Sequence, residues 1–193
     1  MMRIGVLAVQ GDFIEHEKMV EKLGCQVVEL RNKNDMGSLD GLILPGGEST
    51  VQGKLIKELG MFDLLKDLIE GGLPVLGTCA GLILLSKNIS NDEARHFQTL
   101  PVTVERNAYG RQLGSFMSAS AFGSLCDVEM TFIRAPVITA VEKDVEILAR
   151  VDEKIVAVEY KNQMGISFHP ELGEDTRVME YFLRKCRNFS KGQ

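Results

Sequence analysis

The sequence predicts an α/β fold of three layers, in which a mostly parallel central sheet lies between two layers of helices. Short apolar runs of strand length alternate with helical stripes through the first half of the chain, which is typical of such a sheet. The first run, Arg3 to Gln10, alternates too little for a half-exposed strand and indicates a strand buried on both faces. Two later runs lead into helices through glycine-containing turns, at 45–47 and at 77–81.

Each element of the first half has a local signal. The first expected helix has an apolar stripe, formed by Phe13, Ile14, Met19, Val20 and Leu23, and is ended by Gly24. The third strand is stopped by Pro45 and the two glycines that follow it. The expected elements of this half are strands at Arg3–Gln10, Gln26–Leu30, Gly41–Leu44 and near Val75, and helices at Phe13–Leu23, Thr50–Leu59 and Phe62–Glu70.

After about residue 100 the pattern changes to a succession of short strands and one final helix. The chain has no break in composition, long linker or repeat, so we expect residues 1–193 to form one domain, a length that can bury a sizeable core. The expected strands are Val102–Glu105, Gln112–Phe116, Val128–Ile133, Val145–Val151, Ile155–Tyr160 and Met164–Phe168, and the final helix is about Thr176–Phe189.

Composition and charge exclude several classes of protein. The net charge of −5 gives no electrostatic support for nucleic-acid binding. No apolar stretch approaches the length of a membrane span, and the first residues lack the layout of a signal peptide, so we expect a cytoplasmic protein. The four cysteines form no Cys-x-x-Cys pair, which argues against a zinc or iron–sulfur site and for free thiols.

The segment Gly77-Thr78-Cys79-Ala80-Gly81 has the pattern of a nucleophile elbow. It lies between two apolar runs, so that a strand, a tight turn and a helix fit it, and its glycines permit a sharp backbone bend. The thiol of Cys79 would lie at a helix N-terminus, where the partial positive charge favours a thiolate. A small buried cysteine beside packing glycines is the alternative interpretation.

A histidine and a carboxylate follow another buried strand. Pro170 favours an extended His169, and residues two apart in an extended segment point the same way, so His169 and Glu171 can face one partner together. An imidazole oriented by a carboxylate is what a cysteine nucleophile needs as general acid and base. A surface histidine at a strand end is the alternative. We expect His16, between two glutamates, to be a solvated helix residue and His96 to lie in a loop.

The glycines at 46–47 follow a buried strand and precede a helix. Their amides could form an anion-binding hollow, with the Gly47 and Ala80 N–H groups as an oxyanion hole, or they could be a plain turn before a helix cap. Ligands of such sheets bind beyond the carboxyl ends of the strands. We therefore expect the segments 46–50, 77–81 and 169–171 to converge at one edge.

Taken together, these motifs resemble those of the class I, or triad, glutamine amidotransferases, and within them the glutaminase subunits of pyridoxal 5′-phosphate synthases. The resemblance covers nearly the whole chain, and the segments at 46–50, 105–112 and 132–136 are far more specific to the vitamin B6 branch than the elbow and the His-Pro-Glu segment. The segments that carry the resemblance are Gly5–Asp12, Leu42–Thr50, Gly77–Gly81, Val104–Gln112, Phe132–Pro136 and Ser167–Leu172. The stretch Arg95–Pro101 departs from the leucine- and glycine-rich pattern usual before the segment at 105–112, which leaves the connection over 88–101 open.

The resemblance implies a flavodoxin-like class I amidotransferase domain and a role for each matching residue. Cys79 would be the nucleophile, His169 the general acid and base, Glu171 its orienting partner, and the Gly47 and Ala80 amides the oxyanion hole. The implied glutamine-binding residues are Gly46, Gly47, Glu48, Ser49, Arg106, Ile133 and Arg134. Arg106 can pair with an α-carboxylate and Glu48 can accept from an α-ammonium group, although a surface ion pair is the ordinary role of a lone arginine.

The resemblance also implies an activity and a partner. The chain would hydrolyse L-glutamine to L-glutamate and ammonia, without a metal or cofactor, and pass the ammonia to a barrel-shaped (TIM-barrel) synthase subunit in a large hetero-oligomer. The glycine-rich hole predicts weak activity alone and activation by that partner. Two alternatives stay open. One is a glutaminase of another pathway, such as histidine or purine synthesis. The other is a cysteine-elbow redox sensor, chaperone or peptidase, a class that commonly places histidine directly after the cysteine, where this chain has Ala80.

Overall fold

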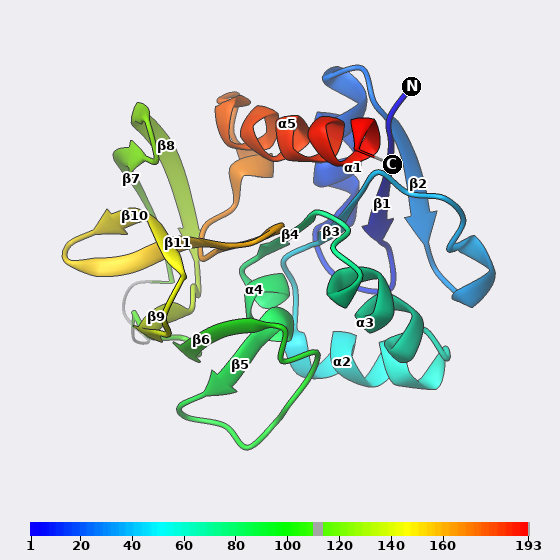
Figure 1. Cartoon of the computed structure of the whole chain (residues 1–193). Coiled ribbons are helices and arrows are strands. Elements are labelled where there is room, and N and C mark those ends of the chain that lie inside the picture. The colour runs from blue at the N-terminus through cyan, green and yellow to red at the C-terminus, as the bar shows by residue number, and fades with distance from the viewer. Residues whose placement is uncertain (110–113, 193) are drawn as a thin grey trace.

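The computed structural model describes residues 1–109 and 114–192 (Figure 1). A curled ten-stranded sheet runs through the molecule, and a two-stranded hairpin stands beside it. Helices α1 and α5 cover one side of the sheet, and α2, α3 and α4 cover the other (Figure 1). The predicted three-layer α/β fold with a mostly parallel central sheet is confirmed.

Five neighbouring strands of the large sheet are parallel, in the spatial order β2-β1-β3-β4-β12. Within this group, β4 pairs with β3 on one side and with β12 on the other. The segments that follow these three strands therefore meet at one edge, as predicted. The five strands are β1 (Arg3–Leu7), β2 (Gln26–Leu30), β3 (Gly41–Leu44), β4 (Val75–Thr78) and β12 (Gln163–Ile166).

Beyond β12 the sheet becomes mixed. The strands β11, β9 and β6 follow with antiparallel pairing, β5 pairs with β6 in parallel, and β10 pairs with β11. The hairpin β7–β8 forms its own sheet. These strands are β5 (Ser86–Ile89), β6 (Leu100–Glu105), β7 (Ser115–Phe122), β8 (Leu125–Ile133), β9 (Val137–Val141), β10 (Glu146–Val151) and β11 (Lys154–Tyr160).

The alternation of side chains along the buried strands divides the core into two parts. On β1, Ile4 and Val6 face the cluster beneath α1 and α5, whereas Leu7 belongs to the cluster of α2, α3 and α4. Each helix buries one stripe against its half of the core. The helices are α1 (Phe13–Lys22), α2 (Ser49–Glu58), α3 (Phe62–Glu70), α4 (Ala80–Leu85) and α5 (Arg177–Lys191), with two 3₁₀ turns, η1 (Lys33–Asp35) and η2 (Pro170–Leu172).

Some predicted boundaries were wrong. The first strand ends at Leu7, because the chain bends away after Ala8 and makes a tight turn at Gly11, whose φ is 101°. The strands β5 and β9 were not predicted. Strand β5 has no apolar pattern of its own and is stabilised by pairing with β6, whereas the sequence of β9, Val-Ile-Thr-Ala-Val, is strand-forming and was missed. Of the strand expected at 112–116, residues 112 and 113 lie outside the described residues, and β7 extends on to Phe122.

The connection over 88–101, whose conformation the sequence did not predict, is anchored by Phe97. Its ring is fully buried and stacks on Phe62 of α3, with ring centroids 5.1 Å apart, and its backbone N–H donates to the Leu84 carbonyl over 3.0 Å.

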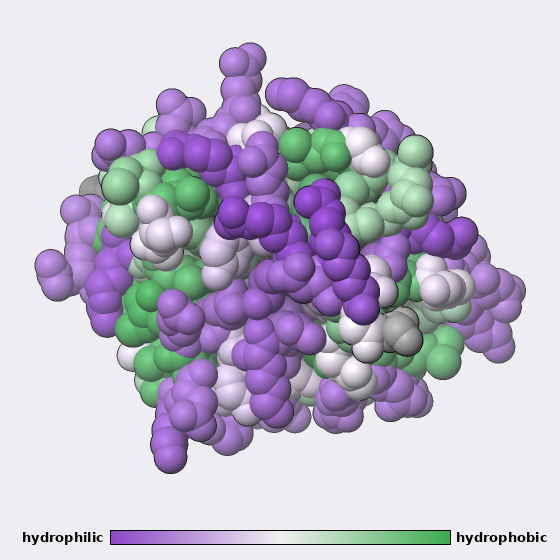
Figure 2. Space-filling view, turned by 45° about the horizontal axis from the view of Figure 1, so that its top comes forward, coloured by the Kyte–Doolittle hydropathy of each residue, from purple (hydrophilic) through white to green (hydrophobic). Residues whose placement is uncertain are grey.

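Among the described residues, no helix is long and apolar enough to cross a membrane. Figure 2, in which the α5 side of the molecule comes forward, shows a broad band of hydrophilic residues with hydrophobic residues gathered on both sides of it.

Candidate active site

The strained backbone of Cys79 is the first feature of the site. Cys79 lies between β4 and α4 with φ of 48° and ψ of −99°, a conformation that side chains rarely adopt and that costs about 1–3 kcal/mol. The glycines around it make this bend possible. A Cβ at Gly77 would lie 2.7 Å from the backbone of Gly81, and a Cβ at Gly81 would overlap the Leu44 carbonyl oxygen on β3. The predicted elbow is present, and its glycines are required by close backbone packing.

The imidazole of His169 and the carboxylate of Glu171 are paired, but not in the extended conformation that was predicted. Residues Pro170–Leu172 form the 3₁₀ turn η2, and His169 precedes it as the N-terminal cap residue. This turn brings the His169 Nδ1 and Glu171 Oε1 atoms to 2.7 Å. Proline at the first position of a helical turn has the φ that the turn needs and lacks an N–H that would be left unpaired. The expected contact is therefore made by a different local structure.

Burial and charge set the protonation of this pair. Burial by itself lowers the pKa of His169, but hydrogen bonding and charge from Cys79 and Glu171 outweigh it and raise the pKa to about 10. Burial would raise the pKa of Glu171, yet the neighbouring His16 and the hydrogen bond with His169 lower it below its usual range. The His169 Nε2 atom is buried and has no other hydrogen-bond partner within residues 1–109 and 114–192. This ring nitrogen is therefore available to exchange a proton with the Cys79 thiol.

The glycine loop after β3 lies against the imidazole. A Cβ at Gly46 would lie 2.5 Å from the His169 Cε1 atom, and Gly47 has φ of 147°, so both positions require glycine. The Gly46 carbonyl accepts from the Asp12 N–H over 3.1 Å and from the Gln52 amide over 3.3 Å. This contact with Asp12 ties the loop to the turn before α1. The loop is therefore a built part of the site and more than a plain turn.

The start of α2 carries two further predicted residues. Glu48 caps the helix, since its carboxylate accepts from the Thr50 and Val51 N–H groups, and its own N–H donates to the Gln10 side chain over 2.9 Å. Ser49 is the buried first residue of α2. The cap fixes the Glu48 carboxylate at the mouth of the site.

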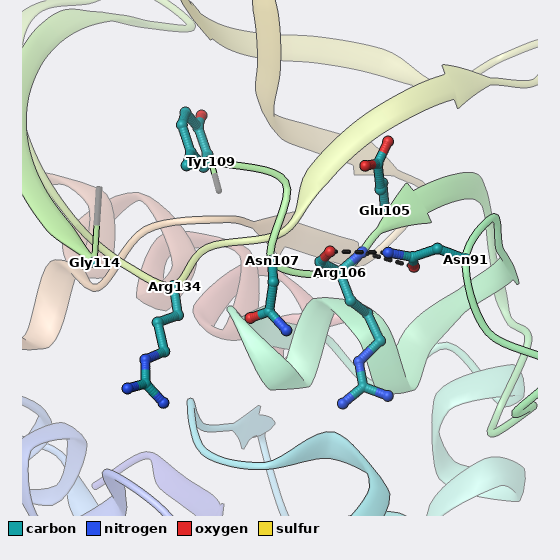
Figure 3. Close-up of a pocket in the computed structure, with 7 residues that line it drawn as sticks. All are labelled: Asn91, Glu105, Arg106, Asn107, Tyr109, Gly114 and Arg134. Atoms are coloured by element: carbon teal, nitrogen blue, oxygen red, sulfur yellow. Dashed lines mark hydrogen bonds between the residues drawn. The ribbon is translucent and has the colours of Figure 1, made fainter. Parts of the chain in front are cut away.

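Arg106 connects this helix to the loop after β5. Its guanidinium donates to the Glu48 carboxylate over 2.8 Å and to the Asp92 carboxylate over 2.5 Å. Its backbone N–H and carbonyl are both held by the Asn91 side chain, each over 3.0 Å (Figure 3). Two of the predicted glutamine-binding residues, Glu48 and Arg106, therefore lie in contact and present opposite charges side by side.

A cavity of about 380 Å³ joins the predicted residues. Gly46, Ala80 and Glu171 are not among its lining residues, while the other predicted positions are. The lining residues are Gln10, Asp12, Gly47, Glu48, Ser49, Cys79, Ile83, Arg106, Asn107, Ile133, Arg134 and His169. The Cys79 thiol faces the Ile133 carbonyl across this cavity, with 3.9 Å between sulfur and oxygen.

A second hollow, of about 580 Å³, adjoins the first and shares Arg106, Asn107 and Arg134 with it. Figure 3 shows the two guanidinium groups on the same side of this hollow, with the Asn107 side chain between them. Arg134 has φ of 45° at the end of β8, which turns its side chain away from the strand direction. The hollow has no titratable pair like that of His169 and Glu171 among its lining residues, so we place the chemistry in the smaller cavity.

Two predictions about α1 were wrong, and one of them concerns a residue of the site. His16 is fully buried rather than solvated: its Nε2 atom lies 3.1 Å from the Thr78 hydroxyl and 3.4 Å from the Glu171 Oε2 atom. Its spacing from Met19 and Val20 puts it on the buried stripe of α1, a signal that its charged neighbours concealed. Ile14, which was expected on that stripe, is exposed.

Polar residues close to the predicted ones also take part. Gln10, Asp12 and Asn107 line the cavity, and Gln52 ties together three carbonyls of the surrounding loops. Donor atoms of Asp12, His169 and Glu171 lie within 4.8 Å of one another, a spacing that could hold a metal ion. Two of these donors are already joined by the His169–Glu171 hydrogen bond. That the site works without a metal or cofactor stays a prediction.

A cysteine on a strained elbow and a histidine held by a carboxylate line one cavity at the edge of a parallel sheet, which is the arrangement that the sequence predicts for a glutamine amidotransferase. A crystal structure described as a glutamine amidotransferase has a TM-score of 0.91 and 43% identity to this chain, and the match covers 95% of this chain and 98% of that one. The sequence profile of the SNO glutamine amidotransferase family matches residues 6–188. The chain belongs to this family.

Named relatives are similar over nearly the whole chain. A protein of Desulfitobacterium hafniense (strain DSM 10664 / DCB-2), named pyridoxal 5′-phosphate synthase subunit PdxT, is 62% identical over 183 residues, which cover 94% of this chain and 92% of the relative. A protein of the same name from Streptococcus pneumoniae (strain CGSP14) is 50% identical over 190 residues, or 96% and 98% of the two chains. A structure described as a putative GMP synthase subunit, 19% identical with a TM-score of 0.68 and covering 99% of this chain and 96% of that one, shares the fold alone.

Proposed function

We propose that this chain hydrolyses L-glutamine to L-glutamate and ammonia as the glutaminase subunit of a pyridoxal 5′-phosphate synthase. One observation carries the proposal: Cys79 and His169, the latter held by Glu171, line the same cavity as the charged pair of Glu48 and Arg106. A nucleophile and an acid–base group at one end, with a cation and an anion at the other, suit a small amino acid with a reactive side-chain amide. The name of the relatives supports the assignment to vitamin B6 synthesis.

The reaction has two halves. In the first, the Cys79 thiolate attacks the Cδ carbon of glutamine, and the carbonyl oxygen becomes an oxyanion that accepts hydrogen bonds from the Gly47 and Ala80 N–H groups. Ala80 is the first residue of α4, so its N–H has no acceptor within the helix. His169 then gives a proton to the departing nitrogen, and ammonia leaves a γ-glutamyl thioester on Cys79.

In the second half, water resolves the thioester. The neutral His169 takes a proton from a water molecule that attacks the thioester carbonyl, and glutamate leaves as the thiolate is restored. Glu171 holds the imidazole in one orientation throughout and stabilises its charged form. Arg106 would bind the α-carboxylate of glutamine and Glu48 its α-ammonium group. The polar atoms between them would be bound by Gly47, Ser49, Ile133 and Arg134. Gly46 does not line the cavity and would contribute by packing against the His169 ring.

The ammonia needs a consumer, because a free product would be lost to solution. By the name of its relatives this chain is one subunit of a synthase, and we propose that the other subunit is the TIM-barrel synthase, in a large hetero-oligomer. The cavity lies at the sheet edge where α1, α2 and η2 begin, so a partner that docks there could take up ammonia directly. We further propose that the chain acts as one domain.

The replacement of Cys79 by alanine tests the chemistry. We expect Cys79→Ala to bind glutamine in calorimetry but to release no ammonia above background, alone or with the synthase subunit, because the thioester cannot form. Cys126→Ala is the matched control, since Cys126 is an exposed free cysteine outside the cavity and should leave the rate unchanged. Turnover retained in Cys79→Ala would refute the mechanism.

A further inference from the structure

A buried histidine of α1 stands behind the histidine–carboxylate pair. The His16 side chain has no exposed surface, and its Nε2 atom lies 3.1 Å from the Thr78 Oγ1 atom and 3.4 Å from the Glu171 Oε2 atom. Thr78 is the last residue of β4 and directly precedes the nucleophile. His16 thereby lies next to two parts of the site: the nucleophile elbow, through Thr78, and the histidine–carboxylate pair, through Glu171. It does not line the cavity, so it would act only through these neighbours.

The second carboxylate oxygen of Glu171, Oε2, needs a hydrogen-bond donor that His16 can supply. The Glu171 side chain is fully buried, and its Oε1 atom is engaged by His169. The Oε2 atom is buried with no hydrogen bond of good geometry within the described ranges 1–109 and 114–192, and His16 Nε2 is the polar group that the structure places beside it. A buried carboxylate oxygen without a donor is costly, and a carboxylate held at one oxygen alone can rotate.

The environment of His16 indicates a neutral imidazole. Burial lowers its pKa, and the charge of His169 acts in the same direction, against the opposing influence of Glu171, Asp12 and Glu15. A neutral ring carries one N–H. The Nε2 atom faces a hydroxyl and a carboxylate, whereas the Nδ1 atom is buried without a partner in the described part of the chain. The hydrogen on Nε2 is thus the tautomer that these neighbours favour.

We propose that His16 is a positioning residue of the glutaminase site, which holds the Glu171 carboxylate through its Nε2–H group so that Oε1 faces the His169 ring. The inference rests on the proposed function for its effect on turnover. Neutrality is part of the role, because a second imidazolium would compete with His169 for the single negative charge of Glu171. A shift of helix α1 would then move His16 and, through it, the Glu171 carboxylate and the His169 ring.

Two variants of His16 separate a positioning role from simple packing. His16→Leu keeps a side chain of similar size but removes the donor, and His16→Gln keeps an N–H group near the position of Nε2. Met19→Leu is the control for disturbing the buried face of the same helix, since Met19 lies one turn further along and outside the cavity. Each variant is assayed for glutamine hydrolysis with the synthase subunit present, and the ionisation of His169 is followed by NMR.

We expect His16→Leu to lower kcat about 10-fold or more, with KM for glutamine within about two-fold, since it removes the N–H group beside the buried Glu171 carboxylate and touches no substrate. We expect His16→Gln to stay within about three-fold of the wild type, and Met19→Leu to match it. With Glu171 less firmly held, His169 in His16→Leu should lose its proton about one pH unit lower than in the wild type.

Equal kcat in wild type and His16→Leu, or equal losses in the leucine and glutamine variants, would overturn the inference. Where His16→Leu fails to fold, His16→Asn replaces it, because its amide is one carbon too short to reach Glu171, and an asparagine variant as active as the glutamine variant would count equally against the idea. Should the wild type release no ammonia, the proposed function fails, while the titration of His169 still decides the role of His16: an unchanged titration in the donor-less variant refutes it.

Discussion

Replacing Gly46 by alanine tests whether the glycine loop is fitted to the imidazole. A Cβ at this position would lie 2.5 Å from His169 Cε1, 2.9 Å from Asp12 Oδ2 and 3.1 Å from His169 Nδ1. An ordinary contact begins near 3.4 Å, so the methyl group requires the ring or the loop to move by about 0.9 Å. The ring is buried and hydrogen-bonded, and therefore has little space in which to move.

The expected effect on catalysis follows from this displacement. A misplacement of about 1 Å at reacting groups lowers rates by about 100-fold, so we expect Gly46→Ala to reduce kcat about 100-fold. The strain should cost about 1–3 kcal/mol in the free energy of unfolding, which for a chain of this length lowers Tm by about 2–12 °C. The variant should thus remain folded while losing most of its activity.

Ammonia release with the synthase subunit present measures the rate, and thermal unfolding measures the stability. Gly37→Ala is the control, because a Cβ there meets only the Arg3 guanidinium at 3.6 Å, an ordinary contact, at an exposed position outside the cavity. A Gly46→Ala enzyme with kcat within two-fold of the wild type would show that the loop is not fitted to His169, and the reasoning would be refuted.

Two further predictions concern charge. The pKa of His169 is raised to about 10 in the folded chain, so the stability that this group contributes is complete below its ordinary value near 6.5 and is lost as the pH rises through about 10. Between pH 7 and pH 10, the free energy of unfolding, measured with denaturant, should accordingly fall more steeply for the wild type than for His169→Gln. Parallel declines would contradict the raised pKa of His169. Arg106→Lys keeps the charge but loses the two-sided contact with Glu48 and Asp92, and we expect KM for glutamine to rise about 10-fold with little change in kcat, measured beside Arg187→Lys on the exposed face of α5. An unchanged KM would remove Arg106 from the binding site.

The sequence was informative wherever a residue type is required by local geometry. Strand-length apolar runs predicted the parallel strands around β4, because a strand buried on both faces must be apolar throughout. The glycines at 77 and 81 predicted the elbow, because no side chain fits between β4, α4 and Leu44. The parallel order of strands then predicted that the segments after β3, β4 and β12 would meet, and the cavity contains residues from all three.

The sequence was less informative where the structure depends on contacts between distant segments. The short strand β5 is stabilised by its neighbour β6, and its own residues do not distinguish it from a loop. The β-branched run of β9 was, by contrast, a local strand signal that was overlooked. The His169–Glu171 contact was expected, but the 3₁₀ turn that makes it was not, since Pro170 is compatible with both an extended segment and the start of a helical turn.

What the sequence by itself determined is the set of chemical groups and the edge of the sheet at which they lie, because parallel strands have their carboxyl ends at one edge and local sterics require glycine in the turns that follow. What only the tertiary structure decided is the environment of each group. His16 has glutamates on both sides in the chain and looks solvated, yet α1 packs over η2 and buries it against Thr78 and Glu171. Burial and partners arise from the packing of whole elements, and these determine which of two similar histidines is charged and which is neutral.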